Sequence, residues 1–226
     1  MQSSDEKDLP TSTVLVTGFE PFGGEAINPS GEIARRLHGW QPQPGTQVKG
    51  IELPCVFGAA IDALRAAIDR HRPELVIALG QASSRSCLGV ERIAINIDDA
   101  RIPDNAGNQP IDEAVITGAP AAMFSGLPIK AIVEDLRRAG IPAEVSQSAG
   151  TFVCNHVFYG LQHMIATRHP KVRGGFIHVP CTPQQSAFRP DTPSMALETI
   201  EQGVRRAVLT SLRTTTDRKL AGGAID

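Results

Sequence analysis

Short apolar runs alternate with amphipathic segments along this chain. Continuous apolar residues predict buried strands at 14–16, 75–79 and 175–179, and weaker runs predict two more at 48–53 and 143–146. Apolar residues three or four positions apart predict helices in the segments 29–37, 57–71, 129–139, 153–161 and 194–212. Strands that alternate with helices indicate an α/β protein, a three-layer α/β/α sandwich around a mostly parallel, twisted sheet of the phosphorylase or hydrolase type.

A further strand is predicted between residues 90 and 97, where apolar and polar residues alternate. Glu91 falls on the same face of this strand as Ile93, Ile95 and Ile97, so we expect its carboxylate to be largely buried. The next stretch, 98–128, is long and rich in Pro and Gly, and such a length favours a functional or interface loop over a simple connector.

The composition predicts a single folded domain. A chain of 226 residues with 41% hydrophobic residues can bury a substantial core in one domain. We place this domain at 13–212. Residues 1–12 and 213–226 are polar, which predicts a disordered N-terminal segment and a flexible C-terminal tail.

Charge and cysteine usage exclude several classes of function. A net charge of −2 gives no reason to expect nucleic acid or an acidic membrane surface as a partner, and no apolar run approaches a membrane span. The four cysteines form no CxxC pair, so neither a metal site nor a disulfide framework is indicated. Reduced thiols and the absence of a secretion-signal pattern near Met1 favour the cytoplasm.

Cys154 is the candidate nucleophile. It follows Ala149-Gly150-Thr151, a sequence that allows a tight turn from strand to helix with Thr151 as the N-cap. Cys154 would then lie in the first helical turn, where the helix dipole lowers a thiol pKa by about one unit. That is less than a strongly activated thiol needs, so a second partner is required. The alternative is a buried structural cysteine.

His178 is the candidate base, because among the six histidines it alone lies inside an apolar strand, near its C-terminal end. His156 is two positions from Cys154 on one helix and points elsewhere. We choose Glu91 to orient the imidazole. Asp98, Asp99 and Asp104 are alternatives, but their loop sequence favours solvated or turn-forming roles. A core histidine and a structural ion pair of Glu91 with Arg85 or Arg101 remain alternatives.

The segment Thr17-Gly18-Phe19-Glu20-Pro21-Phe22-Gly23-Gly24 follows the first strand, the usual place for a ligand loop. It lacks the order of a phosphate-binding loop. Its distinctive residues are Phe19 and Phe22, in a chain with only 4% aromatic residues. Two rings beside flexible glycines suggest a flat apolar ligand, although they could also cover the sheet edge.

Taken together, these motifs resemble the type I pyroglutamyl peptidases. The resemblance runs from about Val14 to Leu212. It rests on the segments Thr17–Gly24, Asn28-Pro29-Ser30, Leu79-Gly80-Gln81-Ala82, Glu91–Asn96, Asp99–Asn105, the Cys154 turn, Phe176-Ile177-His178-Val179-Pro180 and Pro193-Ser194-Met195.

The resemblance implies a cysteine peptidase that removes N-terminal pyroglutamate from peptides through a thioester acyl-enzyme, without metal or cofactor. By motif, Cys154 would be the nucleophile, His178 the base and Glu91 its orienter. The rings of Phe19 and Phe22 would hold the lactam, with Gln81 at its polar edge. The resemblance also implies a cytoplasmic homotetramer. Arg85 is our candidate for oxyanion binding or support of the site.

Two departures leave efficiency and specificity open: Ser83-Ser84 stand where the family often has glycines, and Cys181-Thr182 where it has bulkier apolar residues. Two other functions compete. One is a nucleoside-phosphorylase-like enzyme that binds phosphate through Gly23-Gly24. The other is a non-catalytic protein that binds pyroglutamyl peptides.

Overall fold

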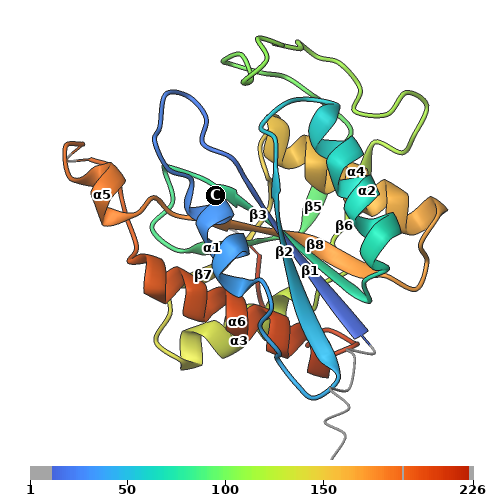
Figure 1. Cartoon of the computed structure of the whole chain (residues 1–226), viewed down its shortest axis with the longest axis vertical. Helices are drawn as coiled ribbons and strands as arrows, with labels where there is room; N and C mark the ends of the chain where they lie inside the picture. The colour runs from blue at the N-terminus through green and yellow to red at the C-terminus, as the bar shows by residue number, and fades with distance from the viewer. Residues whose placement is uncertain (1–11, 190, 224–226) are drawn as a thin grey trace, which may run out of the picture.

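The computed structural model describes residues 12–189 and 191–223. Its main sheet has six strands in the spatial order β2-β1-β3-β8-β4-β7 (Figure 1). In chain order these strands are β1 (Ser12–Phe19), β2 (Thr46–Leu53), β3 (Leu75–Gln81), β4 (Leu88–Glu91), β7 (Ala143–Ser146) and β8 (Arg173–Val179). A separate two-stranded sheet pairs β5 (Ile93–Ile95) with β6 (Ala122–Phe124).

Helices cover both faces of the main sheet, which confirms the predicted three-layer sandwich (Figure 1). One face packs against α1 (Pro29–Leu37), α3 (Ile129–Arg138) and α6 (Leu197–Arg213). The other face packs against α2 (Ala59–His71) and α4 (Val153–Thr167). Each layer buries its own apolar cluster, because alternate side chains of a strand point to opposite faces.

Four neighbouring strands, β2, β1, β3 and β8, run parallel, so their C-terminal ends meet at one edge of the sheet. Beyond them β4 runs antiparallel to β8, and β7 runs parallel to β4. The loops that follow β1 and β5 both reach the C-terminal edge of the parallel strands (Figure 1). A ligand site is expected there, because loops at this edge are positioned by rigid strands.

The single strand predicted for 90–97 is wrong. The predicted strand is interrupted at Arg92: β4 ends at Glu91 in the main sheet, and β5 begins at Ile93 in the small sheet. Glu91 therefore does not share a strand face with Ile93, Ile95 and Ile97, although it is fully buried as expected. The alternation of apolar residues continues through the break, so it could not reveal a change of pairing partner.

Helix boundaries differ from the predictions in three places. Helix α2 begins at Ala59, because Gly58 has a φ of 73° and cannot continue a helix backwards. Helix α6 begins at Leu197, three residues after the predicted start. The short helix α5 (Pro183–Ser186), which opens with a capping box formed by Thr182 and Gln185, was not predicted.

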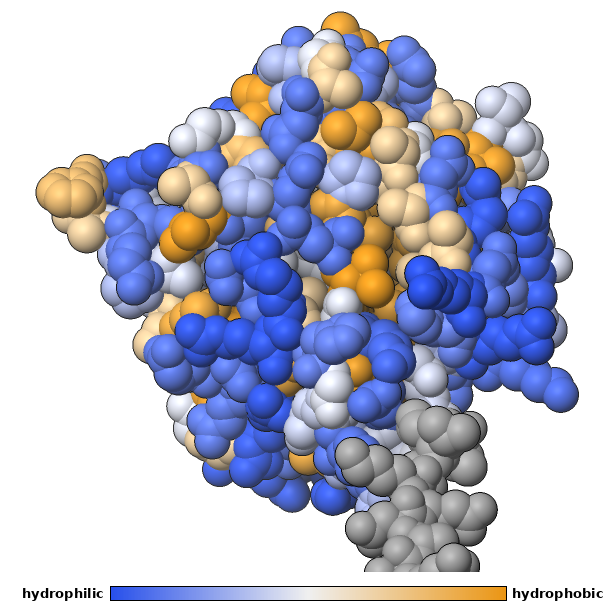
Figure 2. All heavy atoms as spheres, in the orientation of Figure 1, coloured by the Kyte–Doolittle hydropathy of each residue, from blue (hydrophilic) through white to orange (hydrophobic). Residues whose placement is uncertain are grey.

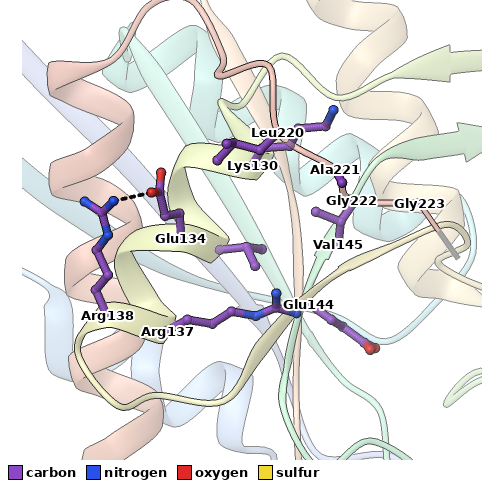
Figure 3. A pocket seen from close by; sticks show the side chains of 11 residues that line it. Lys130, Glu134, Arg137, Arg138, Glu144, Val145, Leu220, Ala221, Gly222 and Gly223 are labelled. Carbon is purple, nitrogen blue, oxygen red and sulfur yellow. Dashed lines mark hydrogen bonds and ion pairs between the residues drawn. The ribbon is translucent and has the colours of Figure 1, made fainter.

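The C-terminal segment makes specific contacts as far as residue 223. Asp217 accepts hydrogen bonds from the amides of Lys130 and Ala131 at the start of α3. The Gly222 carbonyl accepts from Arg92, at 2.7 Å. Figure 3 shows Gly222 and Gly223 beside side chains of α3 and β7. Together these residues line a hollow of about 780 Å³. Polar composition alone had suggested a flexible tail.

Hydrophilic residues cover most of the face seen in Figure 2, and hydrophobic ones come to the surface mainly in its upper half. Among the described residues, no helix is long and apolar enough to cross a membrane. Among the large hydrophobic side chains of the described residues, that of Phe188, just after α5, is the most exposed, at 95%.

The packing of α1 on β2 predicts the effect of one substitution. A Cβ at Gly50 would lie 1.7 Å from the backbone oxygen of Ala34, which cannot move without shifting the helix. We expect Gly50→Ala to lower the free energy of unfolding in urea by about 3 kcal/mol. Gly222→Ala is the control, because its Cβ would meet neighbours at 3.4 Å or more. Equal stability of the two variants would contradict this packing.

Candidate active site

Cys154 is the second residue of α4, at the C-terminal edge of the parallel strands. Thr151 is not the N-cap, contrary to the prediction: the cap position is Phe152, and the Thr151 hydroxyl donates instead to the Asp99 carbonyl at 2.7 Å. The Asp99 amide in turn donates to the Thr151 carbonyl at 2.9 Å. The turn before the nucleophile is therefore tied to the long loop. The first amides of α4 have no acceptor within the helix and can bind an anion.

A glycine provides the space for the Cys154 sulfur. A Cβ at Gly80 would lie 2.6 Å from Cys154 Sγ and 2.7 Å from the Phe176 ring. Gly80 is the direct neighbour of His178 in the β3–β8 register. Because adjacent strands lie about 4.8 Å apart, this places the thiol and the imidazole on the same face of the sheet, within about one strand spacing.

His178 and Glu91 form a buried hydrogen-bonded pair. His178 Nδ1 lies 2.7 Å from Glu91 Oε1. The glutamate is 0% exposed and the histidine 4% exposed. The carboxylate can only accept, so Nδ1 carries the proton and Nε2 is left as the basic nitrogen. The structure thus brings together the imidazole and the carboxylate that the sequence suggested.

Arg85 supports this pair. Its Nη2 donates to Glu91 Oε1 at 3.1 Å, to the Ser146 hydroxyl at 2.7 Å and to the Ser148 carbonyl at 3.2 Å. Its Nη1 forms an ion pair with Glu144 at 2.9 Å. The guanidinium therefore compensates the buried charge of Glu91 and joins β4 to the turn before α4. These contacts favour the supporting role over the oxyanion role.

Burial raises the pKa of the Cys154 thiol well above its ordinary value, and the neighbouring Cys55 and Glu91 raise it further. The contribution predicted from the helix dipole stays a prediction, and burial acts in the opposite direction. Burial also raises the pKa of Cys55 to about 12, with Glu20 and Asp104 adding to the effect. A raised thiol pKa favours the protonated sulfur, so attack by Cys154 would need a proton acceptor beside it.

Three phenylalanines form a row of rings beside the nucleophile. The Phe22 ring lies 6.1 Å from Phe152, which in turn makes an edge-on contact with Phe57 at 5.4 Å. Phe22 is half-buried, whereas Phe19 is 2% exposed and packs in the core beneath. Phe57 and Phe152 were not predicted as site residues. The available signal was that each lies within two residues of the start of a helix, in a chain with few aromatic residues.

The Gln81 side chain points away from Cys154. It donates to Cys181 Sγ at 3.1 Å and accepts from Gln185 at 3.2 Å. These contacts lie on the face of the sheet opposite Gly80, because successive residues of a strand alternate. The structure therefore does not bring this side chain to the thiol and imidazole.

Two loop carboxylates that were predicted to be solvated are in fact buried. Asp98 is hydrogen-bonded to His156 at 2.8 Å. Asp104 accepts from the Asn108 side chain and from the amides of Phe57, Asn108 and Ala106. Burial alone would raise the pKa of Asp104, but these hydrogen bonds outweigh it and lower that pKa. The turn-forming role of Asp104 was anticipated, and its link to Phe57 was not.

The described ranges 12–189 and 191–223 contain no cluster of three or more His, Cys, Asp or Glu side chains that could hold a metal ion. The side chains that the structure brings together at this edge are a thiol, an imidazole and a carboxylate. Together with the sandwich fold, that set defines a protein of the cysteine hydrolase class.

Comparisons with known sequences agree with this class. A sequence profile of the pyroglutamyl peptidase family matches residues 12–214. The pyrrolidone-carboxylate peptidase of Cupriavidus taiwanensis is 59% identical over 215 residues, covering 94% of this chain and 99% of the relative. That of Erwinia tasmaniensis is 56% identical over 211 residues, covering 93% and 98%. The chain belongs to the pyroglutamyl peptidase family and is a hydrolase.

Solved structures agree as well. Pyroglutamyl peptidase I from Bacillus amyloliquefaciens superposes with a TM-score of 0.90 at 46% identity, covering 93% of this chain and 99% of that one. A mutant pyrrolidone carboxyl peptidase from Pyrococcus furiosus gives a TM-score of 0.86 at 45% identity, covering 89% and 98%.

The contact of Cys154 with Gly80 generates a prediction. In Gly80→Ala the new methyl group would meet the buried Phe176 ring as well as the sulfur, so both must shift and some stability should be lost. A nucleophile displaced by about 1 Å costs on the order of 10²-fold in rate, so we expect kcat/KM to fall by about that factor. Steady-state kinetics and the melting temperature measure the two effects. Unchanged kinetics in a folded variant would mean that the sulfur position is not critical.

Proposed function

We propose that this enzyme hydrolyses the amide bond that follows an N-terminal pyroglutamyl residue, with Cys154, His178 and Glu91 as its catalytic triad. The observation that carries the proposal is the Cys154 sulfur over Gly80, next to an imidazole whose Nδ1 is held by buried Glu91. The names of the relatives, pyrrolidone-carboxylate and pyroglutamyl peptidases, support the choice of substrate.

In the first step His178 Nε2 takes the thiol proton as Cys154 Sγ attacks the pyroglutamyl carbonyl carbon. The negative charge moves to the carbonyl oxygen, where the free amides at the start of α4 can stabilise it. The protonated Nε2 then gives its proton to the leaving nitrogen. The C–N bond breaks, the shortened peptide leaves as an amine, and a thioester remains on Cys154.

In the second step a water molecule attacks the thioester, and Nε2 accepts the water proton. The C–S bond breaks, pyroglutamate leaves, and the proton returns to the sulfur. Glu91 accepts the Nδ1 hydrogen bond throughout and stabilises the imidazolium in both steps. Arg85 compensates the negative charge of this carboxylate, because its guanidinium donates to the same Glu91 oxygen as His178.

The lactam ring needs flat apolar walls, one hydrogen-bond acceptor and one donor. Phe22, with Phe152 behind it, supplies a wall, and Phe19 supports the same loop from the core. For the polar edge we infer that the backbone of Gln81 serves in place of its side chain. The Ala82 amide bonds to β8, so the N–H and C=O of Gln81 point the other way, toward β1. The pairing of β1 with β3 ends earlier, at Thr17 and Ala78.

We also propose a cytoplasmic homo-oligomer, a tetramer by resemblance to the family. The four cysteines are free thiols, as expected in a reducing compartment. The exposed Phe188 ring after α5 is a candidate contact between copies. Light scattering on the purified protein measures the assembly size, and a monomer at micromolar concentration would contradict the proposal.

One assay separates the proposed activity from its competitors. A fluorogenic pyroglutamyl amide should be cleaved by the wild type. Iodoacetamide should abolish this activity, and EDTA should leave it unchanged. Cys154→Ala should reduce kcat by at least about 10⁴-fold, because the covalent route is lost. Turnover that survives this substitution would reject the mechanism. Binding without cleavage, or phosphate-dependent cleavage of a nucleoside, would support the other functions.

Glu91→Gln tests the orienting carboxylate. The variant keeps an oxygen within reach of His178 but loses the charge that stabilises the imidazolium. We expect kcat to fall by about 10³-fold while the fold, followed by circular dichroism, is retained. Glu198→Gln serves as the control, because it removes the charge of a carboxylate on α6 whose side chain is 76% exposed. If kcat were unchanged in Glu91→Gln, this residue would not belong to the triad.

A further inference from the structure

One buried ionisable pair takes no part in the proposed chemistry. His156 and Asp98 are each 5% exposed, and His156 Nδ1 lies 2.8 Å from Asp98 Oδ2. His156 is two residues beyond Cys154 on α4, so its side chain projects about 200° away around the helix and cannot reach the reacting groups. A buried pair of this kind carries a large desolvation cost, which other contacts must offset.

The second nitrogen of His156 binds the turn between β2 and α2. Nε2 accepts a hydrogen bond from the Gly58 amide at 2.9 Å. The ring also packs edge-on against Phe57, at 5.3 Å between centroids. Since Nε2 accepts, Nδ1 must carry the proton that bonds to Asp98, and the pair therefore fixes both the tautomer and the ring plane.

The carboxylate of the pair is itself held in place. The Asp98 amide donates to the Glu113 carbonyl at 2.7 Å, and the Glu113 amide donates back at 3.0 Å. Asp98 therefore cannot follow a displaced histidine without opening this bridge. The hydrogen bonds of His156 to Asp98 and Gly58 therefore connect the long loop, α4 and the β2–α2 turn, three segments far apart in the sequence.

The row of rings continues from His156 into the proposed lactam site. Phe57 contacts Phe152, and Phe152 contacts Phe22, the proposed wall of the ring pocket. At the His156 end, the row is fixed by directional hydrogen bonds as well as by packing. Building on the function proposed above, we propose that His156 and Asp98 are positioning residues that fix this aromatic wall and thereby set the affinity for the pyroglutamyl ring.

A merely structural ion pair would behave differently. It would lower the melting temperature and the amount of active enzyme, with KM unchanged. A positioning pair acts on ring binding, so its loss should raise KM and leave kcat per active site nearly constant. The two roles are therefore separated by the KM-against-kcat split, with Cys154 titrated by iodoacetamide to count active sites.

The test uses His156→Phe, which keeps a ring but loses both hydrogen bonds, and Asp98→Ala. Loss of such bonds is worth about tenfold in affinity, so we expect KM to rise by about tenfold with kcat within about twofold. Asp98→Asn retains an acceptor for Nδ1–H and should restore KM to within about threefold of wild type. His163→Phe, on the same helix, is the matched control and should leave KM unchanged.

A second measurement does not depend on turnover: the concentration of free pyroglutamate that protects Cys154 from iodoacetamide. It should rise about tenfold in His156→Phe and stay at the wild-type value in His163→Phe. If the wild type cleaved no pyroglutamyl amide but the protecting concentration still rose in His156→Phe, the proposed function would be rejected. The positioning role would then still be supported. No protection of the wild type, unchanged values in His156→Phe, or a fall in kcat alone would overturn the positioning role.

Discussion

A single carboxylate oxygen organises the candidate active site of this protein. Glu91 Oε1 accepts from both His178 and Arg85, while Oε2 has no partner in the described part of the chain. A buried carboxylate needs compensation, and two donors on one oxygen supply it. Arg85 and His178 thus share one oxygen of Glu91, and in the proposed mechanism the negative charge of this carboxylate would stabilise an imidazolium.

The reversal of strand direction at β4 explains why this carboxylate is so deeply buried. Gly89 lies opposite His178, and because β4 runs antiparallel to β8, Glu91 lies two residues deeper in the sheet. The carboxylate thus meets Nδ1 from the inside, and Nε2 is left facing the edge where α4 begins. The glycines on both neighbouring strands make room, Gly80 for the sulfur and Gly89 for the Arg85 guanidinium.

Local pattern predicts most of the helices and main-sheet strands, and it indicates Cys154 and His178 as candidate reactive groups. Apolar runs located the parallel strands, and His178 stood out as an imidazole inside such a run. The break at Arg92 depended on a choice between two sheets, which alternating residues do not record. The bond from Gly58 to His156 joins residues 98 positions apart, and a loop carboxylate such as Asp98 looks solvated until its partner is known.

Burial has opposite effects on binding and on reactivity at this edge. The aromatic row would exclude water from a lactam, and burial of the nearby Cys154 raises the pKa of its thiol. A helix terminus offers about 0.3–2 kcal/mol, or at most about one and a half pKa units, whereas full burial can shift a pKa by about 3–5 units. In the proposed mechanism proton transfer to His178 accompanies attack by Cys154, so the hydrogen bond to Glu91 would be a condition of reactivity as well as of orientation.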